Sequence, residues 1–92
     1  MVRKRNPDRS GNPWSEETTR LVWQKGEVMP NLSPVAWRKD IYGSLMKFAE
    51  HRNRDSEHGW EINHIKPVSD GGSDDIENLQ PLHLKNNTEK GD

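Results

Sequence analysis

Three polar residues in the last third of the chain have side chains of the types that phosphodiester hydrolysis uses. His64, Asn78 and Asn87 are separated by 14 and 9 residues. An imidazole accepts a proton near neutral pH, and amide oxygens are ligands for hard divalent cations. Hydrolysis needs both a base that deprotonates water and a cation that neutralises charge on the phosphate. We expect Asn78 to accept a hydrogen bond from the second imidazole nitrogen of His64 and so to fix its tautomer.

Two neighbours of the histidine are further candidate metal ligands. Asn63 directly precedes His64, and Glu61 lies two positions before Asn63. Residues two apart share one face of a strand, so Glu61 can bring negative charge to the site directly or through a water. A surface carboxylate paired with a lysine is an equally good interpretation of Glu61.

Other aspartates and histidines are interpreted mainly as structural or surface residues. Asp74 and Asp75 lie in a glycine-rich loop and are interpreted as turn-forming, solvated charges. His83 is a candidate auxiliary metal ligand, although a structural role is favoured. His51 and His58 are interpreted as surface residues.

A hairpin followed by a helix is expected to position the candidate residues. Residues 60–65 alternate in polarity enough to form a strand, and Pro67 prevents that strand from continuing. Residues 69–75 are rich in turn formers, and residues 78–83 can return as a second strand. Residues 84–90 have room for about two helical turns. The expected order is therefore strand, loop, strand and helix.

The first half of the chain is predicted to be mainly helical. Ser15 is a typical cap for a helix that ends near Gly26. Ser33-Pro34 is typical of a cap followed by proline at the first helical position, which predicts a second helix ending at Tyr42-Gly43. The segment 44–54 fits either a short helix or a distorted strand.

Composition limits the chain to one small domain. It has 92 residues, of which 28% are hydrophobic and 32% are charged, so its core must be thin. We expect most of the core to come from the four tryptophans, Trp14, Trp23, Trp37 and Trp60. The absence of cysteine excludes disulfides and thiolate metal sites. No apolar run approaches the roughly 18 residues of a membrane span, which predicts no membrane association and a cytoplasmic protein in a bacterium or a phage-infected cell.

The net charge of −1 conceals an uneven distribution. Residues 1–54 carry 11 Lys or Arg against 6 Asp or Glu, whereas residues 55–92 carry 3 against 9. A basic half can lie along phosphates and an acidic half suits a bound cation, but attraction between the halves within the fold explains the pattern equally well. Residues 1–13 are basic and lack periodicity, which predicts a flexible arm that is either inert or in contact with phosphates.

Three segments of the C-terminal third resemble the HNH endonuclease family. They are WEINHIKP at 60–67, GGSDDIENLQPL at 71–82 and NNTEKGD at 86–92. The core of that family is the ββα-metal hairpin and helix. The resemblance therefore implies an α+β fold in which such a core carries the active site.

The resemblance also implies a division of the chain. Beyond the flexible basic arm of residues 1–13, residues 14–92 would form a single HNH domain. Its helical N-terminal elaboration would cover residues 14–54, and its ββα-metal core would cover residues 59–92.

By resemblance, His64 is the general base, Asn78 orients its ring, and Asn87 is a metal ligand. The residue before the base is also a ligand in this family, where it is usually Asp, or His in the colicin branch. Asn63 departs from that pattern. Two neutral amide oxygens lower the expected metal affinity, and Glu61 is the candidate that restores it. Alternatively, the asparagine slows cleavage and leaves the fold intact.

The function that the resemblance implies is metal-dependent hydrolysis of DNA with little sequence specificity, by nicking or by double-strand cleavage. Mg²⁺ or Mn²⁺ is the expected cofactor, with Zn²⁺ or Ni²⁺ as alternatives. The protein is expected to be a monomer or weak dimer. The side chains expected to contact the phosphate backbone are Arg38, Lys39, Lys47, Arg52, Arg54 and Lys66.

A second hypothesis keeps the scaffold and removes the catalysis. Asn63 would then weaken the metal site of a nucleic-acid-binding or assembly module, such as a phage DNA-packaging accessory with a terminase or another DNA-processing protein as partner. A protein-interaction domain without nucleic acid would leave the spacing of His64, Asn78 and Asn87 unexplained.

Overall fold

The computed structural model describes residues 6–90, which form two helices, five strands and three short 3-10 turns. The elements, in chain order, are α1 (Glu16–Trp23), β1 (Glu27–Val28), β2 (Trp37–Lys39), β3 (Leu45–Lys47), β4 (Trp60–His64), β5 (Leu79–His83) and α2 (Leu84–Lys90). The 3-10 turns are Phe48–Glu50, Val68–Asp70 and Ile76–Asn78. This mixture of helices and antiparallel strands is the expected α+β class.

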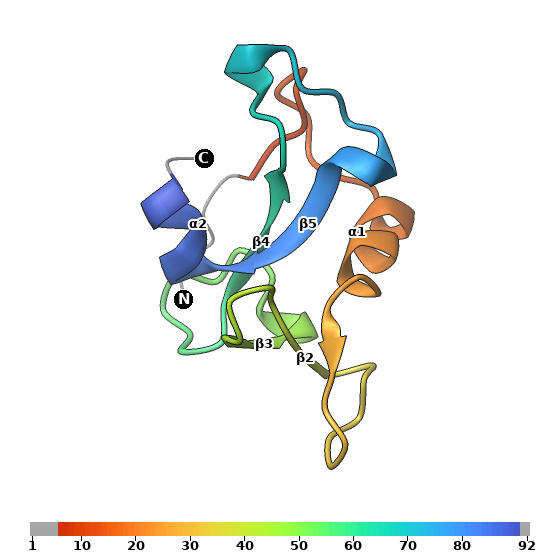
Figure 1. Ribbon diagram of the computed structural model, residues 1–92, viewed down its shortest axis with the longest axis vertical. Coiled ribbons are helices and arrows are strands. Elements are labelled where there is room, and N and C mark those ends of the chain that lie inside the picture. Colours follow the sequence, from red (N-terminus) through yellow and green to blue (C-terminus); the bar gives the residue numbers. More distant parts are fainter. Residues whose placement is uncertain (1–5, 91–92) are drawn as a thin grey trace.

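The centre of the fold is the antiparallel hairpin of β4 and β5. Its register runs from Trp60 opposite His83 to His64 opposite Leu79. The two helices flank this hairpin, with α2 against both strands and α1 against β5 (Figure 1). The predicted order of strand, loop, strand and helix is confirmed.

The predicted helix α1 is also confirmed. The hydroxyl oxygen of Ser15 accepts the backbone N–H of Thr18 at 3.1 Å, as an N-cap does. Glu16 and Glu17 in the first turn place negative charge at the positive end of the helix dipole. The helix ends at Trp23, because the chain then turns into β1.

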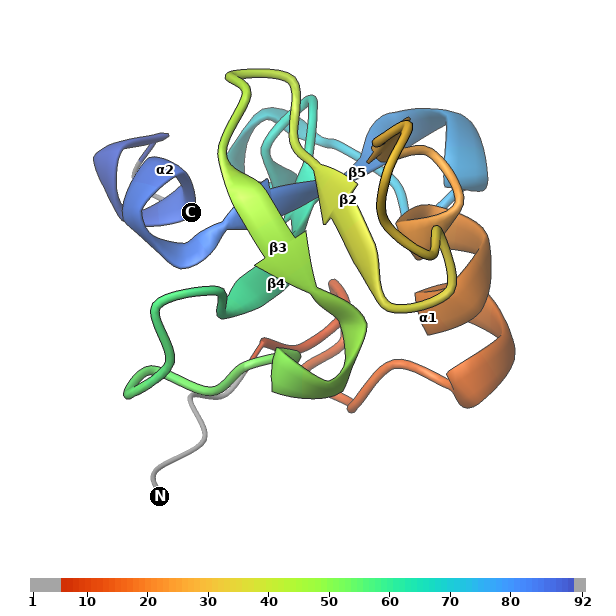
Figure 2. The ribbon, with the colours of Figure 1, turned by 90° about the horizontal axis from the view of Figure 1, so that it is seen from below.

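A second sheet replaces the predicted second helix. Its order is β1–β2–β3, so the central strand β2 pairs antiparallel with β1 on one side and with β3 on the other (β2 and β3 in Figure 2). Only one helical turn forms after Ser33, whose carbonyl accepts the N–H groups of Ala36 and Trp37. The Arg38 side chain then donates to the carbonyls of Pro34, Gln24 and Gly26, each at 3.0 Å. The bonds to Gln24 and Gly26 reach a distant segment and favour an extended conformation for Arg38. The segment 44–54, for which the sequence left helix and strand open, contains β3 and a 3-10 turn.

The core contains two of the four tryptophans. Trp23 and Trp60 are buried with ring centroids 5.0 Å apart, and Ile62 and Leu79 complete the cluster with Val22 and Met46. The indole N–H groups donate to the carbonyls of Pro34 and Phe48. Trp14 packs partly buried against the cluster, and Trp37 is half-buried. The expectation of a tryptophan core is thus confirmed for Trp23 and Trp60.

The described part of the predicted basic arm contacts the core hairpin. The Asn6 side chain accepts the N–H of Ile62 at 2.8 Å and donates to its carbonyl at 2.9 Å. A turn follows in which the Asp8 carboxylate accepts the N–H groups of Ser10 and Asn12, each at 2.9 Å. Residues 6–13 therefore make specific contacts, while residues 1–5 lie outside the described residues.

The buried carboxylate of Asp40 joins the two sheets. One oxygen accepts the N–H groups of Tyr42 and Ser44, each at 3.0 Å, in the turn between β2 and β3. The other accepts the N–H of His83 at 2.9 Å and the amide of Asn86 at 2.7 Å. This carboxylate therefore fixes the start of α2 relative to the N-terminal half.

Substituting Asp40 tests this junction. Asp40→Ala should lower the free energy of unfolding by about 3 kcal/mol, because it leaves buried N–H groups without an acceptor. The melting temperature should fall by roughly 12 to 24 °C in thermal denaturation followed by circular dichroism. Asp40→Asn, which keeps one acceptor oxygen, should lose less. A melting temperature of Asp40→Ala equal to that of the wild type would contradict the role assigned to this residue.

Candidate active site

The strand β4 is buried along all five residues. Glu61, Ile62 and Asn63 have exposed fractions of 0%, 1% and 0%. Ile62 faces the apolar core, whereas the face of Glu61 and Asn63 is covered by α2. The interpretation of Glu61 as a surface carboxylate is therefore wrong, because a helix covers the face that was expected to meet water.

A chain of side-chain hydrogen bonds links β5, β4 and α2 on this face. Gln80 donates its amide N–H to Asn63 Oδ1 at 3.0 Å, and Asn63 donates to Asn87 Oδ1 at 2.9 Å. Asn87 then donates to Glu61 Oε1 at 2.6 Å. The two asparagines expected to hold a metal, 24 residues apart, are thus in direct contact.

The donor set of this chain fits a hard divalent cation. Amide and carboxylate oxygens are the ligands that Mg²⁺ and Mn²⁺ prefer, and Glu61 supplies the negative charge that the amides lack. The oxygens of Asn63 and Asn87 accept N–H groups here, and rotation of the amides would turn them toward a cation. Across residues 6–90 no cluster of three or more His, Asp or Glu provides a different site for a metal ion.

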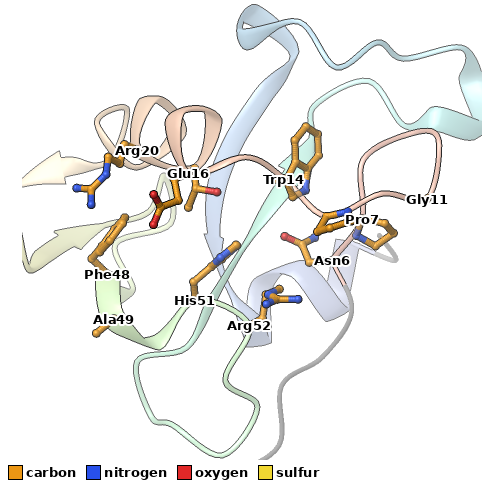
Figure 3. Close-up of a pocket in the computed structure, with 12 residues that line it drawn as sticks. Asn6, Pro7, Gly11, Trp14, Glu16, Arg20, Phe48, Ala49, His51 and Arg52 are labelled. Carbon is orange, nitrogen blue, oxygen red and sulfur yellow. The ribbon is translucent and has the colours of Figure 1, made fainter.

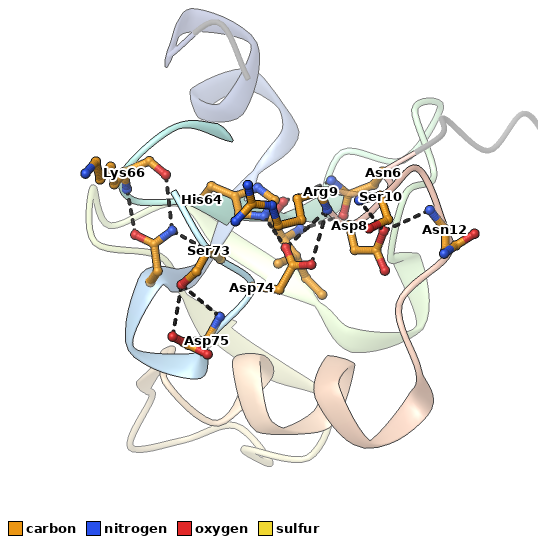
Figure 4. A network of polar contacts seen from close by, with 12 residues as sticks. Asn6, Asp8, Arg9, Ser10, Asn12, His64, Lys66, Ser73, Asp74 and Asp75 are labelled. Carbon is orange, nitrogen blue, oxygen red and sulfur yellow. Dashed lines mark hydrogen bonds and ion pairs between the residues drawn. The ribbon is translucent and has the colours of Figure 1, made fainter. Parts of the chain in front are cut away.

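The candidate base His64 lies at the end of β4 with 6% of its side chain exposed. Its Nε2 lies 2.8 Å from Oδ1 of Asp74 (Figure 4). The ring of Trp14 is 5.5 Å from the imidazole, centroid to centroid. The interpretation of Asp74 as a solvated turn former is therefore wrong. Asp75, in contrast, is exposed and bonds the hydroxyl of Ser73, as a turn former does.

Asn78 bonds the loop rather than the imidazole. Its Oδ1 accepts the N–H of Lys66 at 2.8 Å, and its amide group donates to the carbonyls of Lys66 and Ser73. Among the described residues the expected contact with the ring of His64 is made by Asp74 instead. Asn78 closes the loop that delivers Asp74, so any orienting effect on the base is indirect.

Gly72 allows this loop to close tightly. It donates its N–H to the carbonyl of Pro67 at 2.9 Å. A Cβ atom at this position would lie 1.8 Å from the carbonyl oxygen of Lys66, which no side chain tolerates. Gly72 is thus required by a close approach of two backbone segments, whereas Gly71 adopts a positive φ of 87°.

His83 lies at the far end of the hairpin from His64, opposite Trp60. Its Nε2 is 2.7 Å from the carbonyl of Glu57, and its Nδ1 accepts the N–H of Lys85 at 3.2 Å. Both ring nitrogens therefore have structural partners, which supports the structural interpretation over that of an auxiliary metal ligand.

His51 and His58 are half-buried, so their interpretation as surface residues is wrong. The ring of His51 stacks 4.4 Å from that of Trp60, and His58 meets Trp37 edge-on at 5.1 Å. Tertiary packing of rings is not visible in the spacing of these residues.

The six basic residues expected to contact phosphates differ in exposure. Arg54 and Lys66 are exposed, whereas Arg38, Lys39, Lys47 and Arg52 are half-buried. The guanidinium of Arg38 is engaged by three backbone carbonyls, and the ammonium of Lys47 lies 5.4 Å from the ring of Trp37. Arg38 is therefore a structural residue of the β1–β2 region.

A pocket of about 520 Å³ is lined in part by Trp14 and lies between α1, the segment 6–13 and the chain that follows β3. Glu16 and Arg20 reach into it from α1, opposite His51 and Arg52 (Figure 3). Arg52 has a φ of 64°, a left-handed conformation unusual for a residue other than glycine. Sequence reasoning did not find this pocket, because its walls come from three separate segments.

Two comparisons with known proteins found matches to endonucleases. The family model described as HNH endonuclease matches residues 50–92. A 47-residue segment is 49% identical to "Probable mobile endonuclease C" of Enterobacteria phage T4, covering 49% of this chain and 22% of that relative. The chain thus spans about a fifth of the length of the curated relative that it matches. No solved structure matches.

The described residues contain no helix with the length and apolar character needed to cross a membrane. The matched segment includes β4, β5 and α2, and it therefore contains the contact between Asn63 and Asn87 as well as His64 at the end of β4. Residues 50–92 of this chain therefore match the HNH endonuclease family.

Proposed function

We propose that the protein is a metal-dependent endonuclease that hydrolyses phosphodiester bonds of DNA. The observation that carries the proposal is the contact of 2.9 Å between Asn63 on β4 and Asn87 on α2, with His64 as the next residue of the strand. Oxygen donors next to an imidazole are the combination that metal-assisted hydrolysis uses. The printed name of the phage relative, a mobile endonuclease, supports the same reaction class.

In this reaction His64 acts as the general base. Its ring accepts a proton from water, the water oxygen forms a bond to phosphorus, and the bond from phosphorus to the leaving oxygen breaks. The burial of the ring restricts its rotation, because β4 holds the backbone and Trp14 packs 5.5 Å from the imidazole. Asn78 contributes by holding the loop that covers the Nε2 side of the ring.

Asn63, Asn87 and Glu61 are the residues that would hold the cation, with Mg²⁺ or Mn²⁺ as the proposed ion and Zn²⁺ or Ni²⁺ as alternatives. A bound divalent cation supplies neutralisation of charge on the phosphate and the leaving oxygen. The burial of Glu61 at 0% exposure makes its carboxylate a stronger attractor for a cation than an exposed carboxylate would be.

The affinity for DNA is proposed to come from phosphate contacts. Arg54 and Lys66 are exposed, and Arg20 and Arg52 line the pocket beside Trp14. Contacts of this kind fix the position of a protein on DNA but carry no sequence information. We therefore propose cleavage with little sequence specificity.

Cleavage of supercoiled plasmid in the presence of each metal tests the proposal. His64→Ala should lose about 100-fold or more in rate, because no other group replaces the base. Asn63→Asp should cleave faster than the wild type, since a carboxylate binds a hard cation more tightly than an amide does. His58→Gln, which changes a histidine packed on Trp37 outside the candidate site, should cleave at the rate of the wild type.

Equal nicking by all four proteins would show that the activity is a contaminant. Absence of cleavage by both the wild type and Asn63→Asp, with every metal, would contradict the nuclease proposal.

Thermal stability with and without metal gives a readout independent of cleavage. In EDTA, Asn63→Asp should unfold at a lower temperature than the wild type, because it removes the N–H that bonds Asn87 and buries a second carboxylate near Glu61. The loss of about 1 to 3 kcal/mol corresponds to roughly 4 to 24 °C. Added Mn²⁺ should recover more stability in this variant than in the wild type.

The matched control for this measurement is Asn31→Asp, the same chemical change at an exposed position. It should behave as the wild type in both conditions. A melting temperature of Asn63→Asp that Mn²⁺ leaves unchanged would argue against a cation site at these residues.

One observation favours a second candidate, a DNA-binding module without catalysis. The buried chain from Gln80 through Asn63 and Asn87 to Glu61 gives each of the three amide groups an acceptor and needs no cation to do so. A wild-type protein that retains DNA in a salt-dependent manner and never cleaves it, while Asn63→Asp does, would identify this candidate.

A further inference from the structure

We propose that Asp74 is a positioning residue that sets the tautomer of His64, and that the turn of residues 8–12 holds Asp74 in place. The inference rests on the proposed function, because it concerns the base of that reaction. It was not predicted from the sequence, where Asp74 and Asp75 look alike.

The contact between the two side chains is short and shielded from water. Asp74 Oδ1 lies 2.8 Å from His64 Nε2, and their side chains are 31% and 6% exposed. Ten residues separate them in the chain. The register of the hairpin places His64 opposite Leu79, and the loop between the strands folds back so that Asp74 reaches the imidazole (Figure 4).

A second segment fixes the carboxylate from another side. The backbone N–H of Arg9 lies 3.1 Å from Oδ1 and 3.3 Å from Oδ2 of Asp74. Arg9 belongs to a turn that Asp8 organises by accepting the N–H groups of Ser10 and Asn12. Because Asn6 bonds Ile62 on β4, this turn is anchored to the strand that carries His64.

The chemical consequence follows from the fact that an ionised carboxylate only accepts hydrogen bonds. Nε2 of the neutral imidazole must therefore carry the proton that Asp74 accepts, and the lone pair lies on Nδ1. Acceptance of the proton is thus assigned to Nδ1, the ring nitrogen that Asp74 does not contact. A carboxylate that orients the histidine base of a serine protease acts in the same way, and its replacement by an amide there stabilises the wrong tautomer.

Asp75 provides a matched control for the test. It is the adjacent residue in the same loop, is exposed, and bonds the hydroxyl of Ser73. Asp74→Asn and Asp75→Asn thus remove the same charge from adjacent residues. Only Asp74→Asn alters the group that contacts His64.

The kinetic arm compares kcat and KM for plasmid nicking. Asp74→Asn should lower kcat by about 10- to 100-fold, as loss of an orienting partner of a reacting group typically does, and should leave KM within about twofold. Asp75→Asn should match the wild type in both constants. Equal kcat for Asp74→Asn and the wild type, or an effect confined to KM, would overturn the proposal.

The spectroscopic arm reads the tautomer directly in protein with ¹⁵N-labelled histidine. The ring resonances of His64 are assigned by their loss in His64→Gln. In the wild type the neutral ring should carry its proton on Nε2, and in Asp74→Asn the population protonated on Nδ1 should rise. A wild-type ring protonated on Nδ1, or the same tautomer in both proteins, would overturn the proposal, whereas the absence of any cleavage would count against the proposed function alone.

The role of the turn is tested by Asp8→Ala, which removes the acceptor that organises it. This variant should lower kcat, and it should have no further effect in the Asp74→Asn background, because both changes act through one contact. Additive effects of the two substitutions would overturn the part of the proposal that concerns the turn.

Discussion

The fold and the candidate site both depend on the burial of polar side chains on β4. This strand has no exposed residue, yet it carries Glu61, Asn63 and His64. A buried polar group without a hydrogen-bond partner destabilises the fold, and its cost is a large fraction of the free energy of unfolding of a small domain. Each of these side chains is bonded from a distant part of the chain, and those bonds bring β5, α2 and the hairpin loop onto one strand. The backbone of Ile62 on the same strand bonds Asn6 of the N-terminal segment.

The same constraint links folding to chemistry at position 63. An amide at Asn63 donates to Asn87 and accepts from Gln80, so it completes a neutral hydrogen-bond chain beside the carboxylate of Glu61. A carboxylate there would bind a cation more strongly but would place two negative charges in a buried site. Under the proposed function, the residue at this position would therefore set a balance between stability without metal and affinity for metal.

Local signals predicted the C-terminal elements, because the determinants of β4, β5 and α2 lie within them. The predicted helix at Ser33-Pro34 failed, since bonds from Arg38 to distant carbonyls outweigh the local capping signal. Spacing identified the pair Asn63 and Asn87, whereas no spacing distinguishes Asp74 from Asp75. The contact of Asp74 depends on the path of a loop that Gly72 and Asn78 close, and such a path follows from long-range packing.

The most direct measurement is an anomalous difference map from crystals grown with Mn²⁺. A single strong peak within about 2.5 Å of the side-chain oxygens of Asn63 and Asn87 is the predicted result. Crystals with no peak at these oxygens, in both the wild type and Asn63→Asp, would contradict a metal-dependent nuclease at this site.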